Sequence, residues 1–205
     1  KLMRTLSEID MTSKRACKAI GFPWGIAEEV GKNMRILEMF GLPGIRNLNQ
    51  YFKNYKNQHF QIISLIAKSN ISPKIPYCPI ILGTNFLDQI LILEELNEIK
   101  FNNVAYPLIF LPFVSRASEI IGKRIYLKMD ENNFLLCFNN FIYSNNSISN
   151  IIDNCKNVDI KFIENQDSFT ENEWNELYQL SENTFLEETD SLKQTAAGAG
   201  LSDND

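Results

Sequence analysis

Glycine and proline divide the first 56 residues into three segments, and this punctuation constrains the fold more than any other feature of the sequence. Thr5-Leu6-Ser7-Glu8 is a capping-box pattern, in which the hydroxyl and the carboxylate each satisfy a free N–H at a helix start. Gly21 supplies one helix stop, and Gly41-Leu42-Pro43-Gly44 supplies the next. Apolar side chains between these points recur with a helical period. The sequence therefore predicts three helices within residues 5–56.

Short strands are predicted in the second half of the chain. Lys123 to Met129 alternates between apolar and polar residues, and Phe134 to Phe138 follows as its hairpin partner. The polar residues Asp130 to Asn133 between them have turn chemistry. Val158 to Ile163 is a further predicted strand.

Proline shapes two other predictions. Ile75 to Leu82 contains two prolines, which favours an edge strand or an extended loop over a central strand. The stretch from Pro107 to Leu111 is predicted to run into a helix that begins near Pro112 and stops at Gly122. A second capping box, Thr170-Glu171-Asn172-Glu173, predicts a C-terminal helix.

These patterns together predict an α+β fold in one domain covering residues 1–205. An N-terminal three-helix layer occupies residues 5–56. A small mixed or antiparallel sheet with a hairpin lies within residues 57–163. An acidic helix and a glycine-rich acidic tail occupy residues 164–205.

Charge is distributed unevenly along the chain. Residues 1–56 carry 10 basic and 5 acidic side chains, and residues 57–163 carry 9 of each. Residues 164–205 carry one base and 11 acids. The acidic pI near 5.1 argues against a general nucleic-acid-binding protein. The acidic C-terminal segment instead suggests a part of the chain that meets a basic surface.

Several common kinds of site are excluded by the sequence. His59 is the only histidine, which rules out multi-histidine zinc sites and leaves one imidazole for catalysis. No metal ligand is assigned outside the C-terminal tail, and the sequence leaves the cofactor unknown. The longest strongly apolar run is far shorter than the ~20 residues that span a bilayer. Four scattered cysteines without a recognisable signal peptide predict a soluble, cytoplasmic protein with reduced thiols.

Two candidate catalytic acids, Glu28 and Glu29, lie near the start of the second predicted helix, after Trp24. Adjacent carboxylates there could do acid–base chemistry, with Trp24 in the ligand site. The alternative is structural, because acids are stabilised near a helix N-terminus and Glu28 can pair with Lys32 one turn later. Trp24 would then be a core residue or part of a hydrophobic staple at the helix start.

Arg116 falls inside an apolar stripe made by Phe113, Ala117, Ile120 and Ile121. A charge in such a position must be paired or must face a cavity. One interpretation is structural: the side chain extends its guanidinium to solvent at the edge of the stripe, or bonds to a structural carboxylate. The other is a clamp that binds the carboxylate or phosphate of a small molecule.

Cys78 is the third candidate catalytic residue, as a nucleophile activated by His59 or by a nearby cation. An unpaired cysteine is otherwise a small buried apolar residue. The last residues add Asp203 and Asp205, whose oxygens suit Mg²⁺ or Ca²⁺, or belong to a tail that docks into a groove of its own or a neighbouring subunit. The alternative for the tail is a frayed end.

The chain also resembles a known family. The segments that carry the resemblance are residues 6–10, 14–17, 21–32 and 41–44, with Cys78-Pro79-Ile80, residues 107–116 and the closing residues 197–205. They are similar to an uncharacterised bacterial, mainly alphaproteobacterial family, domain of unknown function 3726. The resemblance implies that the unusual ending is a family feature, and it implies no activity.

Two functional hypotheses therefore remain open. In the first, the protein is a small-molecule-metabolising enzyme or a ligand-binding protein with an anion-binding arginine and a docked C-terminal tail. Trp24, Glu28, Glu29, Cys78 and Arg116 would line one site. In the second, it is a non-catalytic accessory or assembly subunit, and its acidic tail inserts into a partner or a second copy. Whether it is an enzyme stays undecided by these patterns, and neither hypothesis requires a membrane or a nucleic acid.

Overall fold

The computed structural model describes the backbone of residues 3–198 and the side chains of residues 3–184. The described part of the chain forms two compact units, one that ends at Glu164 and one that begins at Asn165. Residues 3–198 form seven α-helices and a six-stranded mixed sheet, which confirms the predicted α+β class. The N-terminal helical layer and the C-terminal helix are both present.

The first three helices begin and end where their local chemistry predicts. They are α1 (Leu6–Ile20), α2 (Trp24–Met39) and α3 (Gly44–Tyr55). The Thr5 hydroxyl accepts from the Glu8 amide at 3.2 Å, and the Thr5 amide donates to the Glu8 carboxylate at 2.8 Å. Gly21 ends α1 with φ of +122°, a conformation that glycine adopts at little cost.

Two helices begin at prolines, and the predictions for both of these segments were wrong. Helix α4 (Pro79–Asp88) starts inside the segment expected to be extended, and α6 (Pro107–Ile121) starts at Pro107 instead of near Pro112. The first residue of a helix donates no intrahelical hydrogen bond, so proline is well suited to that position. Pro112 lies within α6, and Gly122 ends the helix as predicted.

Between these helices the chain forms a short helix α5 (Ile90–Leu93), the 3-10 turn η1 (Glu94–Leu96) and strand β2 (Glu98–Ala105). The other strands are β1 (Ser69–Asn70), β3 (Arg124–Met129), β4 (Asn132–Cys137), β5 (Phe141–Ser144) and β6 (Asn154–Ile163). The predicted hairpin is β3–β4, in which Leu127 pairs with Phe134. Strands β1, β2 and β5 were not predicted.

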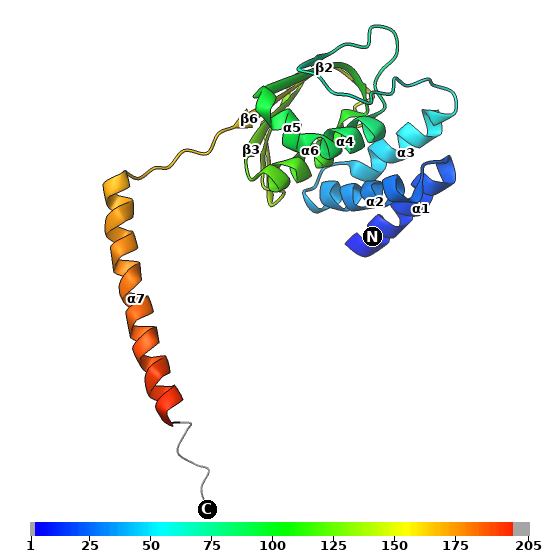
Figure 1. Ribbon diagram of the computed structural model, residues 1–205. Helices are drawn as coiled ribbons and strands as arrows, with labels where there is room; N and C mark the ends of the chain where they lie inside the picture. The colour runs from blue at the N-terminus through cyan, green and yellow to red at the C-terminus, as the bar shows by residue number, and fades with distance from the viewer. Residues whose placement is uncertain (1–2, 199–205) are drawn as a thin grey trace, which may run out of the picture. The chain divides into compact units, whose positions relative to one another are not determined.

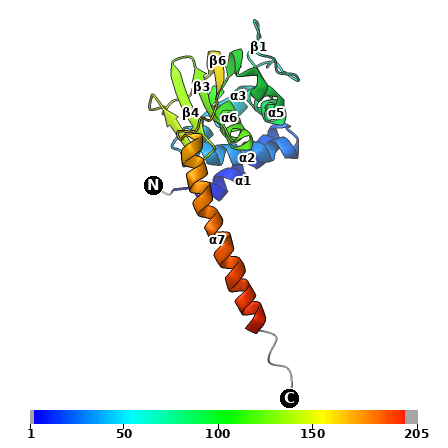
Figure 2. The same cartoon turned by 60° about the vertical axis from the view of Figure 1, so that its left-hand side comes forward.

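The sheet has the order β1-β2-β6-β3-β4-β5, with β1 and β2 parallel and the other pairs antiparallel. Figure 2 shows β4, β3 and β6 as neighbours, as this order requires. Buried and more exposed residues alternate along β3, so its apolar side chains face one side of the sheet. That face meets α6, whose buried residues form the centre of the core.

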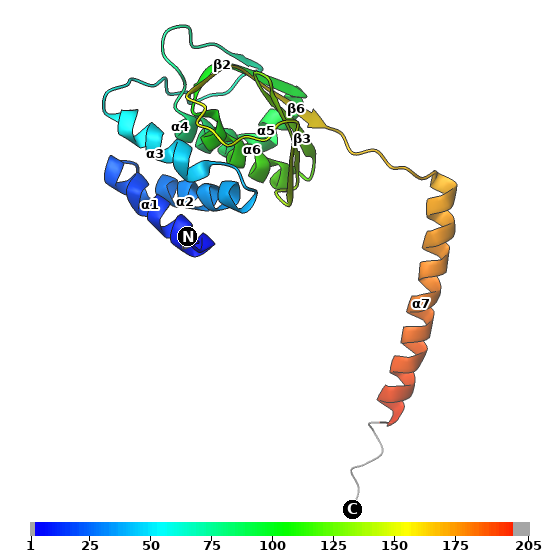
Figure 3. The ribbon, with the colours of Figure 1, turned by 180° about the vertical axis from the view of Figure 1, so that it is seen from behind.

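Unit 1 is therefore layered. Figures 1 and 3 show the sheet on one side, α4, α5 and α6 beneath it, and α1, α2 and α3 on the far side of those helices. The contact between α4 and α6 is close at Gly83, where a Cβ atom would collide with the Phe113 ring. This middle layer positions both of the sites described below, because Cys78 precedes α4 and Arg116 lies on α6.

The second unit contains α7 (Glu171–Gly198). The predicted capping box is present, since the Thr170 amide donates to the Glu173 carboxylate at 2.7 Å. The ring of Phe169 stacks on Trp174, with ring centroids 5.6 Å apart. The tail residues Asp203 and Asp205 lie outside the described residues. Within residues 3–198, the helices lack the combination of length and apolarity required to cross a membrane.

Candidate functional site

Cys78 is the N-cap residue of α4, and its backbone is extended there. Its sulfur accepts a hydrogen bond from the Ile81 amide at 3.4 Å, so the thiol takes the place that serine or aspartate often occupies at a helix start. The Tyr51 hydroxyl of α3 lies 3.0 Å from the same sulfur. Cys78 is buried, with 3% of its surface exposed. Two separate elements therefore hold one thiol in place.

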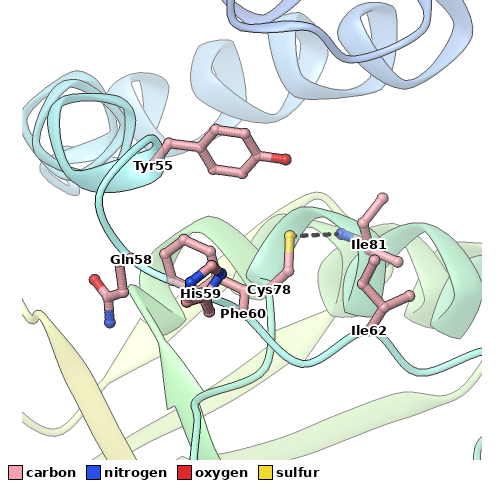
Figure 4. A pocket seen from close by; sticks show the side chains of 7 residues that line it. All are labelled: Tyr55, Gln58, His59, Phe60, Ile62, Cys78 and Ile81. Atoms are coloured by element: carbon pink, nitrogen blue, oxygen red, sulfur yellow. Dashed lines mark hydrogen bonds between the residues drawn. The ribbon is translucent and has the colours of Figure 1, made fainter.

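A cavity of about 250 Å³ opens beside this thiol. Figure 4 shows the side chains around it, which come from the end of α3, the segment that follows it and the start of α4. They are Tyr55, Gln58, His59, Phe60, Ile62, Cys78 and Ile81. The rings of Tyr55 and Phe60 stack, with centroids 5.9 Å apart. The cavity thus combines a nucleophile and the chain's single imidazole with mainly apolar walls.

Burial raises the pKa of the Cys78 thiol, although hydrogen bonds from Tyr51 and from the α4 amides oppose that rise. The sulfur therefore carries its proton at neutral pH. Burial also raises the pKa of Cys17 and Cys155, each to about 12. Within the described residues, Cys78 is the cysteine that lines the cavity just described. Its chemistry depends on a group that can accept its proton.

Arg116 has the paired environment that its place in an apolar stripe demanded. Its guanidinium forms an ion pair with the Glu29 carboxylate of α2. It also donates to the Asn33 side-chain oxygen at 3.3 Å. Asn33 is fully buried, and its side-chain nitrogen has no hydrogen-bond partner among the described residues. Unpaired buried donors are rare, and this one belongs to the residue that contacts the guanidinium.

A second hollow, of about 280 Å³, lies beside Arg116. Three cationic side chains contribute to it, together with two apolar residues and an amide: Lys32, Arg35, Arg116, Ile36, Met39 and Asn139. Glu29 pairs with two of these cations, since Lys32 Nζ lies 3.0 Å from its carboxylate. Three positive charges against one negative charge leave this hollow with a net positive charge.

The two neighbouring glutamates have different surroundings. Burial alone raises the pKa of Glu29, but hydrogen bonds from Lys32 and Arg116 outweigh it and hold that pKa below its ordinary value. Glu28 is more exposed, and the Lys14 ammonium, 2.7 Å away, lowers the pKa of its carboxyl. Both carboxylates are therefore charged at neutral pH and engaged with cations.

Trp24 is half-exposed, with 53% of its surface accessible, and is not part of the core. Lys14 and Lys18 of α1 lie over its ring at 5.7 and 5.6 Å from the centroid. These are cation–π contacts, so the ring connects the start of α2 to α1.

The predicted site residues do not line one common site but lie in separate clusters. Glu29 and Arg116 are in direct contact, and Trp24 and Glu28 share the partner Lys14. The residues lining the cavity beside Cys78 include none of these four. Among the described residues, moreover, no group of three or more histidine, cysteine or acidic side chains is placed to hold a metal ion.

Three residues that contact or line these sites were not predicted from the sequence: Tyr51, Asn33 and Asn139. Tyr51 lies three residues after Leu48 and four before Tyr55, a spacing that places it on their helix face. That pattern could have marked it as buried, but could not have paired it with Cys78. Asn33 and Asn139 carried no distinguishing signal, because asparagine is common throughout the chain.

Comparison with known proteins supports the resemblance seen in the sequence. The family model described as "Protein of unknown function (DUF3726)" matches residues 4–75 of the chain. The match thus covers α1, α2 and α3 with the segment that follows, and the similarity noted for later segments lies beyond it. No curated protein matches the sequence.

A solved structure, malate dehydrogenase from Pyrococcus horikoshii OT3, is similar with a TM-score of 0.47 and 10% sequence identity. The similarity covers 70% of this chain and 50% of that one, so the chain spans about half the length of the dehydrogenase chain. Similarity at this level carries no argument about function.

Proposed function

We propose that this protein binds a small anionic molecule, a carboxylate or a phosphate ester, in the hollow beside Arg116. The observation that carries this proposal is the convergence of Lys32, Arg35 and Arg116 on one hollow of about 280 Å³. Guanidinium groups recognise carboxylates and phosphates through paired N–H donors. The excess of positive charge also favours an anion over a neutral ligand.

The contact between Arg116 and Glu29 supports this proposal and does not compete with it. Glu29 holds the guanidinium in a fixed place, which lowers the entropy lost when a ligand binds. Arg35 is exposed and, among the side chains described, lies within ion-pair distance of no acidic group. Arg35 is therefore the cation most available to an incoming anion.

Calorimetric titration at constant ionic strength tests the proposal, with inorganic phosphate and succinate as probes. We expect binding by the natural chain, and Arg35→Gln should weaken it about ten- to a hundredfold, the effect of losing one charged hydrogen bond. Arg15→Gln is the matched control, because it removes the same charge from an exposed position on α1. Equal affinities for the natural chain and Arg35→Gln would overturn the proposal, as would an equal loss in Arg15→Gln.

A second candidate function, as an accessory or assembly subunit, is favoured by α7. This helix is acidic, yet Trp174, Leu177, Tyr178 and Leu180 on it are all exposed. Large apolar side chains gathered on an exposed helix mark interaction surfaces. We propose that α7, with the tail that follows it, contacts a partner protein or a second copy of the chain.

Light scattering on the full chain tests this second function. Trp174→Ser combined with Leu177→Ser should reduce any assembly, and so should deletion of residues 198–205 if the tail takes part. Glu176→Gln lies on the same helix and serves as the control. If the double variant has the same mass as the natural chain, α7 takes no part in assembly.

We also propose a cytoplasmic location for the protein. The four cysteines are free, and three of them are buried. Unpaired thiols in this number are usual where the surroundings are reducing.

A further inference from the structure

The cavity beside Cys78 is separate from the hollow beside Arg116, because the two share no lining residue. It brings together a thiol, an imidazole and the Tyr55 phenol around one space, as Figure 4 shows. The Tyr51 hydroxyl approaches the same sulfur from within the core. This cluster of titratable side chains takes no part in the anion binding proposed above.

We propose that this cavity takes a small carbonyl compound, to whose carbonyl carbon the Cys78 sulfur adds. A carbon–sulfur bond forms as the carbonyl double bond becomes a single carbon–oxygen bond. The thiol proton passes to a ring nitrogen of His59 and from there to the carbonyl oxygen. The product is a hemithioacetal, the addition is reversible, and no oxidant, reductant or further reactant is needed.

The surroundings of the sulfur suit this chemistry. Cys17, Cys78 and Cys155 are all buried, but Cys78 is the one that lines this cavity and heads a helix. Its sulfur accepts from the Ile81 amide and lies within hydrogen-bond distance of the Tyr51 hydroxyl. Donors aimed at a sulfur stabilise negative charge as it develops there.

His59 provides the proton acceptor that a protonated thiol requires. It is the single histidine of the chain, and it lies exposed in the segment between α3 and the first strand. Imidazole is suited to this work because, in its neutral form, one ring nitrogen accepts a proton while the other carries one. The same ring can return the proton to the oxygen of the bound compound.

The cavity walls indicate which carbonyl compounds fit. Tyr55, Phe60, Ile62 and Ile81 present aromatic and aliphatic surface, while Gln58 and His59 supply polar groups. A volume of about 250 Å³ is below the ~300–1,000 Å³ typical of sites for drug-sized ligands. The ligand class is therefore a compact, largely apolar aldehyde or ketone of about one ring.

The experiment compares alkylation rates of the four cysteines in the folded, full-length protein, using iodoacetamide and peptide mass spectrometry. We expect Cys78 to react about tenfold faster than Cys17 and Cys155, which are as deeply buried. Benzaldehyde is the carbonyl probe, and it should slow the alkylation of Cys78 reversibly. Cys137, which is partly exposed, is the internal control and should be unaffected by benzaldehyde.

Two variants test the role of the cavity. His59→Gln should slow alkylation of Cys78 about tenfold at neutral pH and leave Cys137 unchanged. Ile62→Trp, at a position 62% exposed, should slow it by filling the cavity while His59 is retained. Thermal melting checks that both variants are folded. The proposal fails if Cys78 reacts no faster than Cys17, if His59→Gln has no effect, or if benzaldehyde gives no protection.

Discussion

Around Cys78 the neighbouring side chains are mostly aromatic or aliphatic, whereas around Arg116 they are mostly charged or polar. Tyr51, next to Cys78, contacts the rings of Phe52, Tyr55, Phe60 and Tyr106. Arg116 instead belongs to a group of side chains connected through the Glu29 carboxylate. The first site is therefore held by packing, which salt affects little, and the second by ion pairs, which water and salt weaken.

Tyr51→Ala should produce the largest effect, because it removes a fully buried ring from the aromatic cluster beside Cys78. Deleting a buried aromatic side chain costs about 3–5 kcal/mol of the free energy of unfolding. Urea denaturation followed by circular dichroism measures it. Tyr51→Phe keeps the ring and loses only the hydroxyl next to the sulfur, so about 1 kcal/mol is expected. Equal losses in the two variants would show that packing does not hold this site.

Arg116→Ala should have the next largest effect, because it leaves Glu29 partly buried with one cationic partner fewer. Breaking a fully buried pair costs about 3–5 kcal/mol. Arg116 and Glu29 keep 19% and 24% of their side-chain surface exposed, so we expect about 1–2 kcal/mol.

A double-mutant cycle isolates the pair from the rest of the site. Glu29→Ala and Arg116→Ala should couple by about 1 kcal/mol, and 1 M salt should reduce that coupling. A coupling free energy near zero would mean that the interaction between Glu29 and Arg116 does not stabilise the fold.

Lowering the pH should weaken the Arg116 site and leave the Cys78 site unchanged. The reason is Glu29, whose pKa in the folded protein lies below the ordinary value of 4.5. A lowered pKa stabilises the fold above the unfolded value, and that stabilisation is lost as pH falls through the folded value. The difference in unfolding free energy between the natural chain and Glu29→Gln should therefore be constant near neutral pH and shrink below about pH 4.5.

Urea denaturation at a series of pH values measures this difference. Comparison with Glu29→Gln is needed because Glu8, Glu28 and Glu173 also have lowered pKa values and would contribute to acid loss. Tyr51→Phe provides the contrast, since its cost should not change over the same pH range. A difference that grows as the pH falls would contradict the assignment of charge to Glu29.

Trp24→Ala should have the smallest effect. Its ring is half-exposed and contacts two ammonium groups, and exposed cation–π contacts contribute about 0.5–1 kcal/mol. Thermal melting should show a small decrease, which Trp24→Phe should partly restore. A loss as large as that of Tyr51→Ala would show that Trp24 belongs to the core after all.

Local chemistry made much of the helical part predictable. Capping boxes at Thr5 and Thr170 and stops at Gly21 and Gly122 act within a few residues, so the sequence displays them. Pro79 and Pro107 misled the prediction, because proline both interrupts extended segments and begins helices. Strand β2 was missed because its residues Glu98–Ala105 mix buried and polar positions without strict alternation.

The sequence alone determined the α+β class, the boundaries of the first three helices and the need for Arg116 to be paired or to face a cavity, since each depends on short-range spacing. Tertiary structure decided that the partner is Glu29, that Tyr51 faces the Cys78 thiol, and that His59 shares its cavity. These contacts join residues far apart in the chain. They exist because the helical layers meet at particular faces, and hydrophobic periodicity specifies which face is buried but not which residue lies opposite.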